Sequence, residues 1–134
     1  MTNEPSPQEL LQELCRRDER YPFEAYDFVY QALGFVQHEM KNKGMIKEGP
    51  NHVTGQQLSE GCRDFALQEY GMMAGTVLSS WNIKETADIG ELVYNLININ
   101  LMTRTDTDRK EDFHNVYDMK KAFASGFSFT FDGN

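Results

Sequence analysis

The chain has 134 residues, of which 40% are hydrophobic and 12% aromatic, so it can bury a substantial core. Its net charge of −8 and its isoelectric point of about 4.8 disfavour nucleic acid and anionic membranes as partners, because both carry phosphate. No apolar run approaches the roughly 20 residues that cross a bilayer, and the polar start, MTNEPSPQEL, is unlike a secretory signal. We therefore expect one domain over residues 1–134, in the cytoplasm and without membrane contact.

The N-terminal part is predicted to form a helical pair over residues 6–43, after a disordered start over residues 1–5. Ser6 can cap the first helix, with Pro7 in its first turn and Glu9 bonding back to the cap. Tyr21-Pro22 opens a second, longer helix. Its end is marked by basic residues and a glycine: Lys41, Lys43 and Gly44.

Residues 54–118 are predicted to form a winged-helix-like unit, which is three helices followed by a β-hairpin. Thr54 and Gln57 match a capping box, and Thr86 is expected to cap the last helix. Apolar residues recur along that helix at helical spacing: Ile89, Leu92, Val93, Leu96, Ile97 and Leu101. The expected segments are helices over 54–70, 72–81 and 86–100, a strand over 101–105, a charged turn over 106–112 and a return strand over 114–118. The fold class is thus mainly α, with about five helices and a small C-terminal β element.

Residues 119–134 are predicted to form a tail with a helical turn over 120–124 and a strand. Phe127, Phe129 and Phe131 alternate with period two, so one apolar edge must cover a surface or be covered by a partner. The short helix over 72–81 is expected to turn Met73 inward. Glycines within or beside helices cost up to about 1 kcal/mol each, and close helix packing is the expected reason for Gly55, Gly61, Gly71, Gly75 and Gly90.

Signatures of reaction chemistry are missing from the sequence. The acidic run over 106–112 departs from the EF-hand pattern, since Lys110 takes a ligand position and the closing glutamate is absent. The histidines have no metal-binding spacing, and neither a nucleophile elbow nor a phosphate-binding glycine loop occurs. We expect no catalytic residue, no metal and no cofactor. The histidines are His38, His52 and His114, and the two cysteines, Cys15 and Cys62, are expected to be reduced, buried thiols.

The first functional hypothesis is a non-enzymatic, cytoplasmic interaction module that binds a protein partner or itself. Aromatic side chains near the end of the chain are its expected anchors. These are Tyr94, Tyr117, Phe127, Phe129 and Phe131. The alternative is that the same aromatic side chains complete the core.

A nucleic-acid-binding regulator of winged-helix type is the second hypothesis. Its reading helix would lie in the major groove, yet residues 86–101 carry two acidic and no basic residues. Residues 104–112 carry four acidic and three basic residues. Because a negative surface is repelled by phosphate, nucleic acid is not the expected partner.

A small-ligand binder or enzyme is the third hypothesis. Its site would be assembled from His52, Arg63, Asp64 and Trp81. Trp81 would then form a stacking platform for the ligand, whereas the alternative places it in the core as a packed aromatic.

A set of short motifs spread along the chain resembles an uncharacterised bacterial family of planctomycetes, verrucomicrobia and relatives. The matching residues are Tyr21-Pro-Phe-Glu-Ala-Tyr26, His52-Val-Thr-Gly-Gln56, Leu58, Gly61, Arg63-Asp64, Ala66-Leu67, Tyr70-Gly71, Trp81, Thr86, Asp88, Gly90-Glu91, Val93, Asn95-Leu96, Leu101, Glu111-Asp112-Phe113 and Tyr117-Asp118. The resemblance covers almost the whole chain, and members of the family have about this length. It implies one intact domain and no assigned activity or site.

Overall fold

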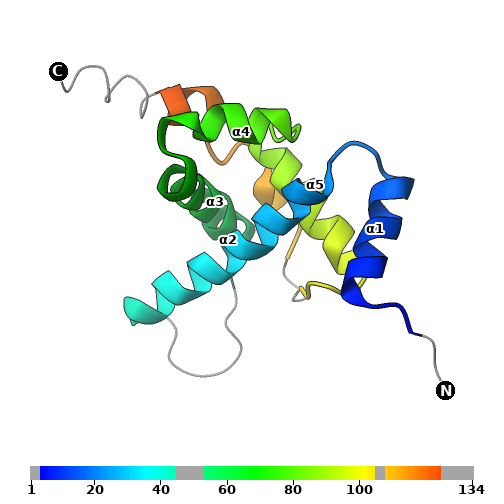
Figure 1. Cartoon of the computed structure of the whole chain (residues 1–134). Coiled ribbons are helices and arrows are strands. Elements are labelled where there is room, and N and C mark those ends of the chain that lie inside the picture. The colour runs from blue at the N-terminus through cyan, green and yellow to red at the C-terminus, as the bar shows by residue number, and fades with distance from the viewer. Residues whose placement is uncertain (1–3, 45–52, 105–107, 125–134) are drawn as a thin grey trace.

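Helices make up most of the structure, which is a computed structural model that describes residues 4–44, 53–104 and 108–124. In these ranges the chain forms, in order, α1 (Pro7–Arg17), α2 (Phe23–Asn42), α3 (Gly55–Tyr70), the short 3₁₀ helix η1 (Gly71–Met73), α4 (Ala74–Ser80), α5 (Thr86–Asn98) and the 3₁₀ helix η2 (Lys110–Phe113) (Figure 1). Residues 119–124 are also helical. The predictions of a mainly α fold, of about five helices and of a helical turn near 120–124 are confirmed.

Capping boxes start α1 and α3 where the sequence predicts them. Ser6 Oγ accepts from the Glu9 N–H and Glu9 Oε1 accepts from the Ser6 N–H, both at 3.1 Å. Thr54 Oγ1 accepts from the Gln57 N–H at 3.0 Å, and Gln57 Oε1 accepts from the Thr54 N–H at 2.9 Å. Each box satisfies two otherwise unpaired N–H groups with residues three apart, which is why sequence alone locates them.

The predicted cap of α5 is wrong by one residue. Glu85 is the N-cap, and Thr86 is the first helical residue with its side chain 1% exposed. Thr86 Oγ1 accepts from the backbone N–H of Val116 at 3.1 Å, so a distant segment uses the hydroxyl expected to cap the helix. Asp88 occupies the first turn as predicted, and its carboxylate accepts from the N–H groups of Lys84 and Glu85.

α2 packs against both α3 and α5, and the buried side chains of these helices belong to one hydrophobic cluster (Figure 1). α2 and α3 approach closely at Gly61, where an added Cβ would lie 1.9 Å from Val36 Cγ2. Close packing also explains Gly55, Gly75 and Gly90, whose nearest neighbours are Asp112, Phe123 and Phe113. It does not explain Gly71, which ends α3 at φ +55° with open space around it.

The predicted wing is absent from the residues that the structure describes. Residues 101–104 and 114–118 form bends, turns and irregular backbone, so the strands expected there are wrong. η2 (Lys110–Phe113) takes up the last residues of the charged turn expected over 106–112. The N–H groups of Leu101 and Met102 both donate to Leu96 O, at 2.9 and 3.3 Å, which folds the chain back onto the end of α5. Met102 and Phe113 are then buried, at 8% and 5% exposure. Burial of these two side chains in the core therefore fixes this segment, and its described residues do not form the predicted hairpin. The predicted strand over 127–131 lies outside the described residues.

The turn between α3 and α4 exposes its methionines. Met72 and Met73 of η1 are 52% and 53% exposed, so the prediction that Met73 points inward is wrong. Ala74 and Leu78 of α4 are buried instead. In the described ranges, none of the helices combines the length and apolar character needed to cross a lipid bilayer.

Candidate functional site

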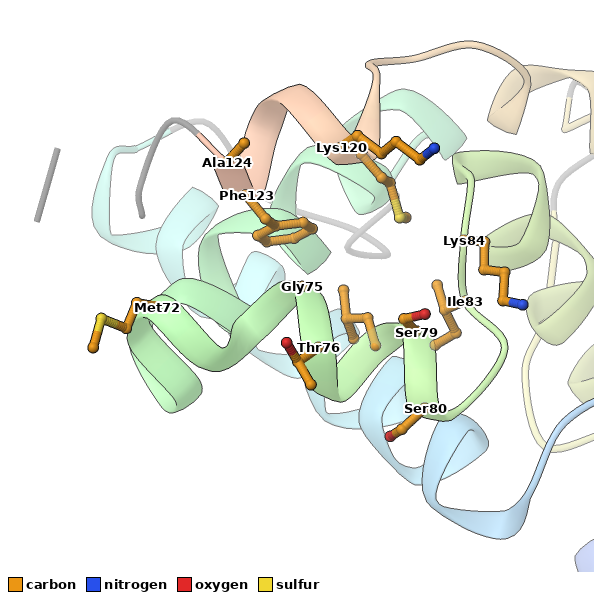
Figure 2. Close-up of a pocket in the computed structure, with 12 residues that line it drawn as sticks. Met72, Gly75, Thr76, Ser79, Ser80, Ile83, Lys84, Lys120, Phe123 and Ala124 are labelled. Atoms are coloured by element: carbon orange, nitrogen blue, oxygen red, sulfur yellow. The ribbon is translucent and has the colours of Figure 1, made fainter. Parts of the chain in front are cut away.

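A groove with a volume of about 870 Å³ opens between α4 and the helical residues 119–124 (Figure 2). We call it the α4 groove. Its lining residues are Met72, Gly75, Thr76, Leu78, Ser79, Ser80, Ile83, Lys84, Met119, Lys120, Phe123 and Ala124. They come from η1, α4, the α4–α5 connection and the last described turn of the chain.

The floor of the α4 groove is apolar and well packed. Leu78 and Ile83 are each 1% exposed, and Met119 and Phe123 are 7% and 8% exposed. The two walls meet at Gly75, because a Cβ there would lie 3.1 Å from Phe123 Cβ. Asp118 fixes the start of the second wall, with its Oδ1 accepting from the Lys121 N–H at 3.2 Å and its carbonyl accepting from the Ala122 N–H at 2.9 Å.

The rim of the groove differs between its two ends. Exposed Met72 lies at one end, and Lys84 and Lys120 lie toward the other (Figure 2). Neither lysine forms an ion pair within residues 4–44, 53–104 and 108–124. The groove thus offers an apolar floor, a flexible thioether at one end and two unpaired ammonium groups at the other.

The lining of the groove combines apolar side chains with a few polar groups. It contains hydroxyl, thioether and ammonium groups but no carboxylate, imidazole or thiol. General acid–base catalysis and metal ligation draw chiefly on those three missing groups. Across the described part of the chain, no three or more His, Cys, Asp or Glu side chains gather to hold a metal ion.

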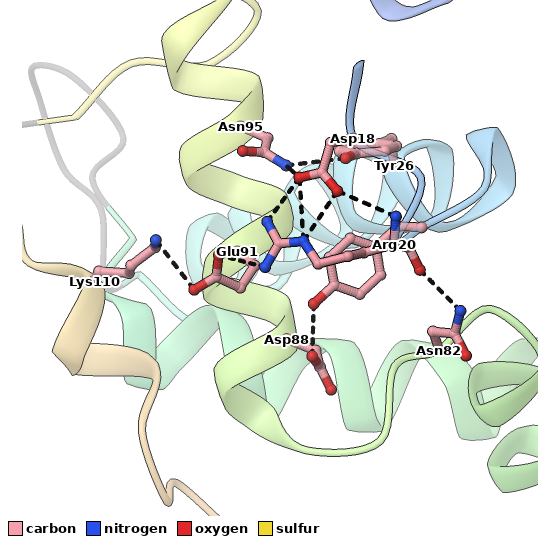
Figure 3. Close-up of polar contacts among 9 residues, drawn as sticks. Asp18, Arg20, Tyr26, Asn82, Asp88, Glu91, Asn95 and Lys110 are labelled. Carbon is pink, nitrogen blue, oxygen red and sulfur yellow. Dashed lines mark hydrogen bonds and ion pairs between the residues drawn. The ribbon is translucent and has the colours of Figure 1, made fainter. Parts of the chain in front are cut away.

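A polar network joins the α1–α2 connection to α5 on another part of the surface (Figure 3). We call it the Arg20 network. Arg20 Nη2 lies 2.7 Å from Asp18 Oδ2, and Arg20 Nη1 lies 3.0 Å from Glu91 Oε1. Asn95 Nδ2 donates to Asp18 Oδ2 and to the Tyr26 hydroxyl, both at 3.0 Å.

Interactions within the Arg20 network favour the charged forms of Asp18 and Glu91. The hydrogen bond from Arg20 holds the pKa of Asp18 well below its usual range. Partial burial acts to raise the pKa of Glu91, but hydrogen bonds from Lys110 and Arg20 outweigh it and lower that pKa. The Glu91–Lys110 ion pair, at 3.1 Å, ties η2 to the same face of α5. These groups engage one another, so we assign the network to fold stability.

The two predicted docking tyrosines that the structure describes are both half-buried. Tyr117 donates its hydroxyl to Ser59 O at 2.8 Å, and burial raises its pKa. The Arg63 guanidinium lies 5.4 Å from the centre of its ring. Tyr94 buries its hydroxyl, which has no hydrogen-bond partner among the described residues, and the Arg104 guanidinium lies 6.0 Å from its ring centre. Phe127, Phe129 and Phe131 lie outside the described residues.

The described residues of the predicted ligand pocket, Arg63, Asp64 and Trp81, do not share the same neighbours. Arg63 pairs with the adjacent Asp64 at 3.1 Å. Trp81 contacts two other aromatic rings, with centroid distances of 5.8 Å to Phe28 and 6.0 Å to Tyr70. These ring contacts match the alternative interpretation, in which Trp81 is a packed aromatic of the core. His52 lies outside the described residues.

Both cysteines are free, Cys62 being buried and Cys15 half-buried. Burial raises the pKa of each thiol, and Glu24 and Asp18 add to the effect at Cys15. A raised pKa leaves little reactive thiolate at neutral pH.

No protein-family profile, curated protein or solved structure matches this chain. The α4 groove is a feature that the sequence interpretation did not find. Met119 and Phe123 are four residues apart, which is the spacing of one helical face. That spacing, with the small residue Gly75 in the facing helix, is the signal that could have indicated it.

Proposed function

We propose that this chain is a non-enzymatic interaction module whose α4 groove binds an apolar segment of a partner protein. The observation that supports this function is a groove of about 870 Å³ that combines apolar lining residues with the exposed side chain of Met72 on its rim. Contiguous apolar surface at an opening of this size is typical of ligand and protein binding sites.

The groove also suggests the chemistry of the partner segment. Its floor suits aromatic or branched aliphatic side chains, each of which contributes about 1.5–3 kcal/mol when fully buried. Met72 has a flexible, polarizable side chain that can adapt to the shape of the segment. Lys84 and Lys120 favour an acidic residue at one end of that segment.

Nucleic acid is supported less well as a partner. A winged-helix-like second half with a small β element would favour it, but the described residues after α5 provide no wing strand. The carboxylates of α5 would face phosphate there, and Glu91 is negative and paired within the Arg20 network.

We propose the cytoplasm as the place of action, because free thiols suit a reducing compartment. Membership of the planctomycete and verrucomicrobia family that the sequence resembles is likewise a proposal, and it brings no activity with it.

Site-specific photo-crosslinking tests the proposed function. The full chain would carry p-benzoylphenylalanine in place of Met72, on the groove rim, in its native cells. The matched control places the same residue at Tyr30 of α2, which is 57% exposed and does not line the groove. We expect a discrete adduct from position 72 that is missing from position 30. No adduct from position 72, or the same adducts from both positions, would contradict the proposal.

A further inference from the structure

We propose that Met72, on the rim of the α4 groove, is a reversible oxidation site, and that its modification by a hydroperoxide weakens binding in the groove. This inference rests on the proposed function, because it assigns a regulator to the same binding surface. It concerns the exposed rim of the groove rather than its packed floor.

Solvent exposure divides the methionines of the described residues. Met72 and Met73 are 52% and 53% exposed, whereas Met102 and Met119 are buried at 8% and 7%. Met40 is half-buried and packs against the core. Since an oxidant must reach the sulfur atom, exposure decides which methionine reacts first. A hydroperoxide should therefore modify Met72 and Met73 before the others.

The two cysteines offer little competition for the oxidant. A hydroperoxide reacts with the thiolate form of cysteine. Burial raises the pKa of both Cys15 and Cys62, so each remains a protonated thiol at neutral pH. A thioether carries no proton and needs no ionisation. Within residues 4–44, 53–104 and 108–124, the most exposed sulfur-bearing side chains are thus Met72 and Met73.

The proposed modification is the transfer of one oxygen atom. A lone pair of Met72 Sδ attacks one oxygen of hydrogen peroxide, the S–O bond forms, and the O–O bond breaks. The sulfur is oxidised by two electrons to a sulfoxide, and the departing hydroxide takes up the proton of the transferred oxygen and leaves as water. Methionine sulfoxide reductases return a sulfoxide to the thioether, which makes the modification reversible.

A sulfoxide at position 72 changes the groove without entering the core. Met72 lies at the end of the groove away from Lys84 and Lys120 (Figure 2). The sulfoxide oxygen is polar, and an apolar partner segment that covers it removes its water without replacing the hydrogen bonds. Met73 is equally exposed but does not line the groove, so its oxidation should leave binding unchanged.

Peptide mapping by tandem mass spectrometry tests the site itself. The purified full chain is treated with hydrogen peroxide and sampled over time. We expect sulfoxide to form at Met72 and Met73 about tenfold faster than at Met102 and Met119. Equal rates at Met72 and at the two buried methionines would overturn the proposal.

Photo-crosslinking tests the consequence for binding. p-Benzoylphenylalanine replaces Thr76, an exposed residue that also lines the groove, in native cells treated with hydrogen peroxide. The variants M72L and M73L each remove one exposed thioether and keep an apolar side chain. We expect peroxide to lower the adduct yield from position 76 at least about threefold in M73L and to leave it unchanged in M72L.

Equal losses in M72L and M73L would overturn the proposal, because the sensitive group would then lie elsewhere. An unchanged yield in M73L would overturn it as well, while the adduct itself leaves the proposed function standing. The function fails separately. If untreated cells give no adduct from position 72 or position 76, the proposed function is contradicted, and this inference falls with it.

Discussion

Gly61 allows the backbones of α2 and α3 to approach more closely than any larger residue would. A Cβ at this position would overlap Val36 Cγ2 at 1.9 Å, and Val36 is 6% exposed. Val36 is β-branched and has few helical rotamers, so its methyl group cannot turn away at little cost. The contact between the two helices therefore depends on a missing side chain.

We predict that Gly61→Ala lowers the free energy of unfolding by about 1–3 kcal/mol, as overpacking of a core does. Gly34→Ala is the matched control, because Gly34 is exposed in α2 with nothing within 4 Å of an added Cβ. Alanine should raise stability there by up to about 1 kcal/mol through helix propensity. Urea denaturation of both variants measures the difference, and equal effects at the two positions would be inconsistent with the packing described.

At the scale of elements, the Arg20 network fastens the α1–α2 connection to α5 by contacts between residues more than 70 positions apart. Sequence patterns predict each helix but not this network, because nothing local indicates that Arg20 faces Glu91. The same holds for the end of α5. Its apolar period predicts the helix, but the burial of Met102 and Phe113, which replaces the wing, depends on distant residues.

Acid should weaken the Arg20 network. Arg20 lowers the pKa of Asp18 in the folded state. The stabilisation from Asp18 is therefore fully present above its unfolded pKa of about 3.9 and is lost as the pH falls through that value toward the folded pKa. We predict that Asp18→Asn lowers the free energy of unfolding by at most about 1 kcal/mol at neutral pH, since the pair is partly exposed.

Urea denaturation between about pH 7 and pH 3 measures this effect, and the deficit of Asp18→Asn should shrink below about pH 4. Glu19→Gln removes a neighbouring exposed carboxylate that has no hydrogen bond or ion pair in the described ranges, and should have little effect at any pH. A deficit that stays constant with pH would argue against the ion pair.

Asn100 makes the turn after α5, at the position where the sequence predicts the last residue of that helix. Its φ is +64°, and its N–H donates to Ile97 O at 2.9 Å. We predict that Asn100→Ala costs about 1 kcal/mol in unfolding free energy, whereas Asn100→Gly is neutral or stabilising. A helix that continued through Asn100, as predicted, would give the opposite order, with glycine worse than alanine. Thermal denaturation of the pair distinguishes these two backbones.

At the scale of the whole molecule, the α4 groove combines elements that the sequence places far apart. The sequence predicts the helical turn near 120–124 and the close packing at Gly75, and both are confirmed. It does not predict that these two features face each other, because no local pattern encodes which helix the last turn meets. The groove, and the function proposed for it, follow from that tertiary contact.

The rim charges should contribute to partner binding. We predict that K84E/K120E lowers the yield of the adduct from position 72 roughly three- to tenfold, or about 0.7–1.4 kcal/mol. The control K41E/K43E makes the same change of net charge at the exposed end of α2. Equal losses in the two double variants would assign the effect to net charge alone.

The adduct yield from p-benzoylphenylalanine at position 72, relative to position 30, tests the central claim most directly. It should be measured in the full wild-type chain. The account predicts a discrete adduct from position 72 that position 30 does not give. Indistinguishable adducts from the two positions would show that the α4 groove is not the binding face.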